Sequence, residues 1–286
     1  MTRSAGDPLQ DWPRPSRLLV VGLDLAWSPR NPTGACVAAW DGKVARLVEP
    51  PRADLGGNEE IAEYVRAGVR DEPAVVAIDC PLAVPNRGGL RDCDVLMNRF
   101  FRRFEAGVYP ANQTSLGRYG GLRGVSLAGT LAADGFSLDP RAWTERRVIE
   151  VYPHAAMIGM FGLRRTLKYK PRQGRSYEER WREMAKLQRL LAGLRDATPP
   201  FRIEDRILRR VPTGIRGGEL KRLEDVLDSL ICAYVGLAYG VDGLRRCAVF
   251  GDGARGHIVV PTPSWLARRA ADVPARDVMF DRSRYI

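Results

Sequence analysis

Residues 17–27, Arg17-Leu-Leu-Val-Val-Gly-Leu-Asp-Leu-Ala-Trp27, form an almost continuous apolar run. A strand that is apolar at consecutive positions is buried on both faces, as in the centre of a sheet covered by helices. Residues 33–40 and 44–48 are predicted to be the next two strands, and Asp41-Gly42 between them is a strong hairpin signal. The chain is therefore expected to open with a three-stranded antiparallel meander.

The rest of the chain alternates between helical and extended patterns. Helices are predicted over residues 58–69, 91–105, 177–194, 203–210 and 219–239, strands over 74–79 and 147–151, and a hairpin over 250–261. The glycine-rich segment 107–135 is expected to be an ordered loop, and the chain after Ser264 to be polar. The fold class that fits is α/β, with a mixed five-stranded sheet and helices on both faces.

The expected organisation is a single domain at residues 17–266, between a disordered leader (1–16) and a C-terminal tail (267–286). Insertions into this domain are expected at about 86–145 and 156–215, of which the second is helical and basic.

The composition is that of an ordinary globular protein, with 286 residues and a net charge of +11. It excludes a disordered, collagen-like or disulfide-stapled chain. The two histidines exclude a multi-histidine metal site, and the five cysteines, none in C-x-x-C spacing, favour a reducing cytoplasm. The longest charge-free apolar stretch, Ser229–Val241, is shorter than the roughly 20 residues of a membrane span, so no membrane partner is expected. The positive balance indicates a polyanionic partner or solubility alone.

Three acids stand near the ends of predicted strands: Asp24, Asp79 and Glu150. A carboxylate inside an apolar strand is costly to bury unless it is paired or bound to a ligand. Ligand sites of open α/β sheets lie at the C-terminal ends of the strands, so these acids are candidates for one site.

Two further acids, Asp225 and Asp228, lie three residues apart on one face of the helix 219–239. Small residues continue that face, which permits a close approach of the helix to the sheet. The alternative is that the two acids only cap the helix and favour its dipole, which suits Asp228 poorly because the helix begins near Glu219. Carboxylates without a histidine cluster suit Mg²⁺ or Mn²⁺, and one or two such ions support phosphoryl displacement.

Seven segments resemble a known family. They are VVGLDLAW (20–27), AIDCPLAVP (77–85), GLRDCD (89–94), EVYPHA (150–155), YK (169–170), EDVLDSLICAY (224–234) and GHIVVP (256–261). In this order they resemble domain-of-unknown-function family 429, classed as ribonuclease H-like predicted nucleases, and the late D-x-x-D helix is similar to that of Holliday-junction resolvases. The resemblance implies a ribonuclease H-like fold with Asp24, Asp79, Asp225 and Asp228 as metal ligands and catalytic residues. Glu150 belongs to the family's own EVYP pattern and is counted among the candidate catalytic residues, with its contact to a metal left open.

Other candidate residues each have two interpretations. His154 is a general base or phosphate donor, or a hydrogen-bonded packing residue. The candidate substrate-binding residues are Arg91, Asn112, Gln113, Tyr169 and Lys170. Arg91 alternatively forms an ion pair with Asp94 at the start of a helix, and the two amides alternatively form turns. Tyr169 alternatively packs in the core, and Lys170 is alternatively one of many solvated surface residues.

The leading hypothesis is a metal-dependent nuclease that acts on DNA or RNA, as a monomer or a homodimer. The alternative is a ribonuclease H-like module that binds nucleic acid or protein without cutting it. A nucleotide-dependent phosphotransferase of the actin and sugar-kinase type is disfavoured, because the chain has no internal repeat and no G-x-x-x-x-G-K-[ST] motif.

Overall fold

The computed structural model describes residues 12–203 and 205–284. The strands are β1 (Leu18–Asp24), β2 (Thr33–Trp40), β3 (Ala45–Leu47), β4 (Arg52–Leu55), β5 (Ala74–Ile78), β6 (Arg146–Glu150), β7 (Phe201–Arg202), β8 (Cys247–Asp252), β9 (Gly256–Pro261) and β10 (Val278–Met279). The α-helices are α1 (Asn58–Val69), α2 (Asp92–Phe101), α3 (Gln113–Gly117), α4 (Arg123–Ala133), α5 (Pro153–Phe161), α6 (Tyr177–Ala192), α7 (Asp205–Leu208), α8 (Gly217–Asp242) and α9 (Ser264–Ala270). Short 3-10 turns follow α2, α6, α8 and β10, at Arg102–Phe104, Gly193–Asp196, Gly243–Arg245 and Arg282–Arg284.

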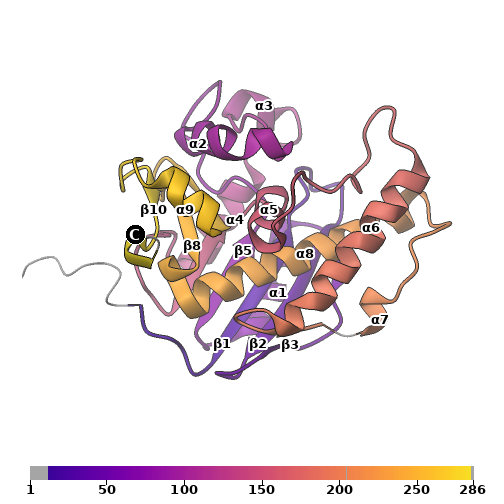
Figure 1. Cartoon of the computed structure of the whole chain (residues 1–286), viewed down its shortest axis with the longest axis horizontal. Helices are drawn as coiled ribbons and strands as arrows, with labels where there is room; N and C mark the ends of the chain where they lie inside the picture. The colour runs from indigo at the N-terminus through magenta and orange to yellow at the C-terminus, as the bar shows by residue number, and fades with distance from the viewer. Residues whose placement is uncertain (1–11, 204, 285–286) are drawn as a thin grey trace, which may run out of the picture.

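The main sheet has the strand order β6-β5-β1-β2-β3-β7, with β4 paired to β2 (Figure 1). β1, β2 and β3 are antiparallel, whereas β1, β5 and β6 are parallel. This is the predicted meander followed by parallel strands. The sheet has seven strands where five were expected, because β4 and the two-residue β7 add to its edge beyond β2 and β3.

Strand β1 is buried on both faces, as its unbroken apolar sequence predicts. Leu18 and Val20 enter the core on the α8 side, whereas Leu19, Val21 and Leu23 enter the core on the α1 and α4 side. Successive side chains of a strand point to opposite faces, so one apolar run supplies both cores. β1 is thereby fixed at the centre of a three-layer fold.

Helix α8 crosses one face of the main sheet at very short range (Figure 1). A Cβ atom added to Gly22 of β1 would lie 2.1 Å from the Ser229 carbonyl oxygen, and one added to Gly34 of β2 would lie 2.2 Å from the Asp225 carbonyl oxygen. On the helix, Gly236 fits against Val20 in the same way. The close approach that the small residues predicted is therefore confirmed, and it presses the first half of α8 onto β1 and β2.

The apolar composition of α8 is explained by this packing. Residues 217–245 are long and apolar enough to cross a membrane, but 89% of their most apolar window is buried inside the fold. The sheet and the surrounding helices supply the apolar environment that the sequence requires.

Two segments differ from their predicted structure. The expected loop 107–135 contains helices α3 and α4, and α4 packs on α1. Residues 267–284 of the expected tail (267–286) are part of the fold, because α9 is buried at Leu266 and Ala270, and β10 pairs with β8 in a second sheet of order β10-β8-β9; residues 285–286 lie outside the described residues. Most of the predicted leader lies outside the described residues, but Trp12 is buried and its ring contacts that of Tyr239 edge-on at 5.1 Å.

Candidate functional site

Four carboxylates converge at one end of the main sheet. Asp24 is the last residue of β1, and Asp79 follows β5 directly. β1 and β5 are parallel neighbours, and the Asp79 amide donates a hydrogen bond to the Leu23 carbonyl at 2.8 Å, so the two strand ends are adjacent. Asp225 and Asp228 lie in the first half of α8, which is packed against these strands. The two strand-end acids and the two helix acids that the sequence singled out thus lie together.

The carboxyl groups of Asp24 and Asp225 interact, and the interaction raises the pKa of Asp225. Burial is the main cause that raises the pKa of Asp225 to about 8, and the Asp24 carboxylate raises it further. Burial also raises the pKa of Asp24, against the opposing charge of Lys170. The Lys221 ammonium forms an ion pair with Asp225 and lies 3.2 Å from Glu224. Even with this lysine present, the acid pair retains a proton at neutral pH.

Asp228 is fully buried and is held from two directions. The Tyr169 hydroxyl donates to its Oδ1 at 2.5 Å, and the Lys170 ammonium lies 2.7 Å from its Oδ2. Burial alone lowers the pKa of Lys170, but Asp228 and Asp24 raise it well above its usual range, so the lysine stays charged. Tyr169 and Lys170 both belong to the candidate site, and the interpretation of Lys170 as one of many solvated residues is wrong.

Asp79 experiences the charge of this whole cluster. Burial raises its pKa well above the usual value, and the carboxylates of Asp24 and Asp228 add to the increase, while Lys170 opposes it. Four carboxylates (Asp24, Asp79, Asp225 and Asp228) therefore face two ammonium groups, Lys170 and Lys221. The site holds more carboxyl groups than it has lysines to pair with them, and the raised pKa values show that their full ionisation is unfavourable.

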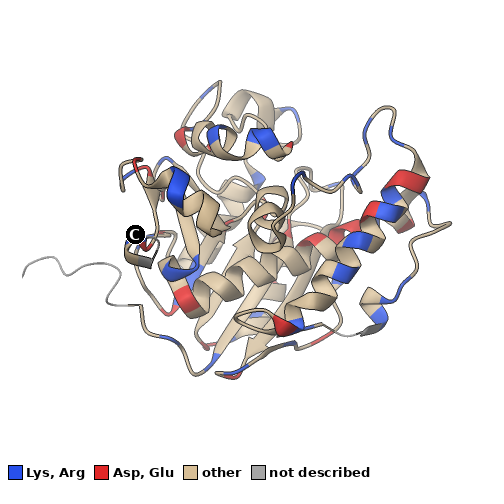
Figure 2. Ribbon diagram, in the orientation of Figure 1, with Lys and Arg blue, Asp and Glu red and all other residues tan. Residues whose placement is uncertain are grey.

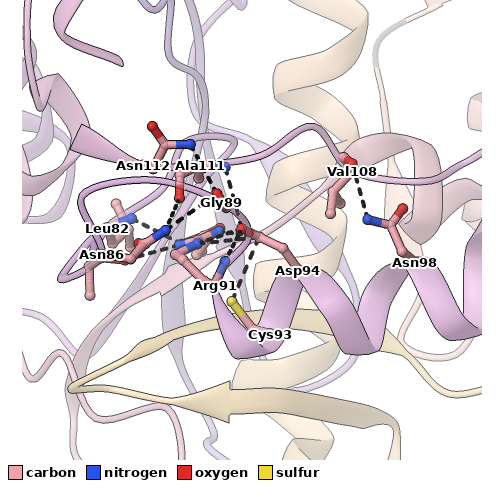
Figure 3. A network of polar contacts seen from close by, with 12 residues as sticks. Leu82, Asn86, Gly89, Arg91, Cys93, Asp94, Asn98, Val108, Ala111 and Asn112 are labelled. Carbon is pink, nitrogen blue, oxygen red and sulfur yellow. Dashed lines mark hydrogen bonds and ion pairs between the residues drawn. The ribbon is translucent and has the colours of Figure 1, made fainter. Parts of the chain in front are cut away.

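Glu150 occupies a strand end like the others, but its direct partner is an arginine, Arg91, and not a lysine of the cluster. The Arg91 guanidinium donates to both of its carboxylate oxygens, at 2.6 and 2.9 Å, and the Leu82 amide donates to it at 3.0 Å. Arg91 also binds Asp94 at 2.8 Å, which closes the first turn of α2 (Figure 3). The ion-pair interpretation of Arg91 is confirmed, and the contacts made by Glu150 are those of a structural carboxylate.

His154 is held as a neutral ring. Its Nδ1 lies 2.8 Å from the Thr166 hydroxyl, and its ring lies 5.9 Å from that of Tyr169. Burial is the main cause that lowers the pKa of His154 to about 3, and Lys170 lowers it further. The residue is therefore next to the candidate site and uncharged at neutral pH.

The predicted amide pair fixes loops. The Asn112 side chain caps α3 by accepting from the Ser115 amide at 2.8 Å and donates to the Gly89 carbonyl at 2.9 Å (Figure 3). Gln113 donates to the Val84 carbonyl at 3.2 Å. These contacts support the turn-forming interpretation of both residues.

The acids open onto solvent through two cavities. A cavity of about 410 Å³ is lined by Asp24, Asp225, Lys221, Trp27 and Tyr119, among others. A smaller one, of about 70 Å³, is lined by Asp79 together with the Arg91–Glu150 pair. Lys221 and Trp27 were not identified from the sequence as site residues. Lys221 could have been found from its spacing of four residues from Asp225 on the same helix. Trp27 could have been found from its position three residues after Asp24.

The four aspartates have the chemistry of ligands for a hard divalent cation, although two of them now form ion pairs with Lys170 and Lys221. Across residues 12–203 and 205–284, no group of three or more His, Cys, Asp or Glu side chains has the arrangement of a formed metal site. The four aspartates nevertheless supply only oxygen ligands, the kind that Mg²⁺ and Mn²⁺ prefer. The raised pKa of Asp225 beside Asp24 indicates that a positive charge between these two carboxylates would be favourable.

The fold and this cluster define a class: a mixed α/β protein, consistent with ribonuclease H-like topology, that gathers aspartates at the ends of its first parallel strand pair. The chain belongs to the family of proteins of unknown function DUF429, which it matches over residues 22–252. No curated protein and no solved structure matches the chain.

Proposed function

We propose that this protein hydrolyses phosphodiester bonds of nucleic acid with the help of Mg²⁺ or Mn²⁺. The observation that carries the proposal is the excess of carboxylates at the ends of β1 and β5, where Asp24, Asp79, Asp225 and Asp228 outnumber their lysine partners. A buried cluster of this kind is costly to the fold, and such clusters are typical of functional sites.

Asp24, Asp79, Asp225 and Asp228 would hold the cation, which would displace the proton that Asp225 keeps at neutral pH. When bound, such a cation supplies activation of water and stabilisation of charge on the phosphoryl group. The chain's own residues do the rest. Tyr169 fixes the Asp228 carboxylate, and Lys170, which is partly exposed to solvent, is placed to neutralise an incoming phosphate.

The nucleic-acid partner is supported by the distribution of positive charge. Residues 163–182, which lead into α6, contain eight Lys and Arg against two Glu. Along α6 itself Lys and Arg alternate with Glu, and this helix packs beside α8 (Figure 2). Arg180 of α6 lies 3.6 Å from Glu224, so this part of the chain is in contact with the acidic half of α8. Basic side chains near an acidic centre suit a phosphodiester backbone, whose binding depends on neutralising phosphates.

A module that binds without cutting is favoured by one specific observation. Lys170 and Lys221 already form ion pairs with Asp228 and Asp225, which is a self-contained arrangement. This alternative differs from the proposal in one measurable respect, because it requires no divalent cation.

The test is cleavage of labelled single-stranded and double-stranded DNA and RNA with Mg²⁺, with Mn²⁺ and with EDTA. We expect cleavage only with a divalent cation, and a decrease of about a hundredfold or more in Asp24→Asn and Asp228→Asn. Asp196→Asn is the matched control, because this aspartate is 79% exposed and its ion pair is with its neighbour Arg195, which is itself exposed. Tight binding in EDTA with no cleavage under any condition would establish the binding module instead.

A further inference from the structure

Three large aromatic side chains are exposed around the candidate site. Trp27 is 38% exposed, Tyr119 is 52% exposed and Tyr109 is 76% exposed. The rings of Trp27 and Tyr119 meet edge-on at 5.3 Å. Aromatic rings of this size normally contribute to a protein by burial, so a group of exposed ones indicates a binding surface. We call Trp27, Tyr109 and Tyr119 the aromatic rim.

The aromatic rim is continuous with the acidic cluster. Trp27 lines the cavity that contains Asp24 and Asp225, and it also lines the smaller cavity that contains Asp79. A third cavity, of about 380 Å³, is lined by Trp27, Tyr109, Pro110, Ser115, Arg118 and Tyr119. This volume lies within the range of small-molecule sites. A group seated there would be next to the carboxylates.

The segment that carries Tyr109 and Tyr119 is held in place by built contacts. The Asn86 side chain donates to the Ala111 carbonyl at 3.0 Å, and Asn112 ties the same segment to Gly89 (Figure 3). The Tyr119 amide closes the turn after α3 on the Leu116 carbonyl. Such preorganisation lowers the entropic cost of binding.

The chemistry of this third cavity suits a nucleobase better than a protein segment. Its lining is aromatic and polar, with one arginine and no aliphatic side chain other than a proline. Aromatic faces stack on any base, and an arginine beside them neutralises a backbone phosphate. A stable protein partner would be expected to bury a much larger surface than the six residues that line this cavity provide.

We propose that the aromatic rim stacks an unpaired nucleobase beside the phosphate to be cut, so that the substrate is single-stranded or locally unpaired nucleic acid. The proposal rests on the proposed function and names its substrate class. Trp27 and Tyr119 supply the stacking faces, Tyr109 closes the outer side, and Arg118 pairs with the adjoining phosphate. A base inside a duplex is already stacked on its neighbours and cannot enter.

The test is the binding of fluorescein-labelled oligonucleotides, measured by anisotropy in EDTA so that nothing is cut. Three probes of equal length are compared: a single strand, the same strand with a central abasic site, and the duplex. We expect the single strand to bind about tenfold tighter than either other probe. Equal affinity for the intact and abasic strands, or tighter binding of the duplex, would overturn the proposal.

Variants assign the effect to the aromatic rim. Trp27→Ala and Tyr109→Ala should lose most of the preference for the intact strand, whereas Tyr119→Phe should keep it. Trp143→Ala is the matched control, because Trp143 is 41% exposed and lines none of the three cavities. Tyr109 is the most exposed of the three, so its variant decides the question if Trp27→Ala fails to fold. An unchanged preference in folded Tyr109→Ala would refute the role of the rim.

The failures of the two proposals are distinguishable. Base-dependent binding in EDTA without cleavage in Mg²⁺ or Mn²⁺ would remove the hydrolysis and leave the aromatic rim standing. Metal-dependent cleavage of single strand and duplex at equal rates, unaffected by Tyr109→Ala, would remove the rim and leave the hydrolysis. A dimer that Tyr109→Ala dissociates, without base-dependent binding, would assign the rim to contact between two copies of the chain.

Discussion

Replacing Gly22 by alanine should damage both the fold and the candidate site, although it adds a single methyl group. The new Cβ would lie 2.1 Å from the Ser229 carbonyl oxygen and 2.5 Å from the Ala233 nitrogen. Both are backbone atoms of α8, so neither can rotate away. Ordinary contact begins at 3.4 Å, so the helix would have to move from β1 by about 1.3 Å at this point.

The magnitude follows from the packing. Inserting a methyl group into a filled core typically costs about 1–3 kcal/mol when side chains can adjust. Here a helix with 26 residues must shift against the sheet, so we expect a loss of about 3 kcal/mol or more in the free energy of unfolding. The same shift moves Asp228, one residue before Ser229, away from the end of β1, and metal-dependent cleavage should fall with it.

The assay is urea unfolding followed by circular dichroism, with Gly129→Ala as the control. Gly129 lies in helix α4, and its added Cβ would have no atom within 4 Å. That substitution should therefore stabilise the protein by about 0.5–1 kcal/mol, because alanine favours a helix over glycine. A Gly22→Ala protein within about 1 kcal/mol of wild type, with an unchanged denaturant slope, would refute the close-approach reasoning.

Three further predictions concern buried charges. Burial is the main cause that lowers the pKa of His257 to about 3, and its neutral Nε2 accepts a hydrogen bond from the Glu150 amide at 3.0 Å. In the unfolded chain this histidine takes up a proton near pH 6.5, so the free energy of unfolding should fall by about 2 kcal/mol between pH 7 and pH 5. His257→Gln should abolish this dependence on pH in urea unfolding experiments. Arg91→Met should lower the free energy of unfolding by about 3–5 kcal/mol, because it leaves the carboxylates of Glu150 and Asp94 buried without their partner. Thermal and urea unfolding measure this change, and a decrease of less than about 1 kcal/mol would contradict the prediction. Asp225→Asn should stabilise the fold by about 4 kcal/mol at pH 7 and have little effect at pH 4, because the folded pKa of about 8 lies above the unfolded value and the cost of keeping the proton grows with pH between them. Equal stability of the two proteins at pH 8 would show that burial of this carboxyl is not costly.

The sequence predicted those parts of the fold that depend on local pattern. The apolar run of β1 predicts a buried central strand, and the small residues on one face of α8 predict a buried helix face. Together they predict a helix that packs closely on a central strand. Helix α4 was missed because glycine lowers the local preference for a helix. Gly124 is in fact required there by packing, since a Cβ at that position would lie 2.4 Å from the Pro81 carbonyl oxygen. The strand β10 has two residues, and only its pairing with β8 defines it.

The candidate site was predictable to the extent that topology brings strand ends together. Asp24 and Asp79 follow parallel neighbours, so their proximity is a consequence of strand order. Glu150 follows the next strand and has the same local sequence signal. Glu150 differs from Asp24 and Asp79 because it is bound by Arg91, which lies 59 positions away in the chain. No local pattern in one sequence reveals which of several acids receives a distant arginine.

The contrast between these two sets of acids is the strongest physical argument for a function at the first. At Glu150 the chain supplies a two-pronged guanidinium and a backbone amide, which oppose the increase in pKa that burial causes. At Asp24, Asp79 and Asp225 burial and the neighbouring carboxylates both raise the pKa values, and lysines are the groups that oppose them. A fold that can supply an arginine and an amide to one buried acid has the means to do so for others. The unfavourable set of carboxyl groups at one end of the sheet lies beside exposed aromatic rings and two cavities. It does not stabilise the fold, so it is better explained by the binding of a positively charged ligand from outside the chain.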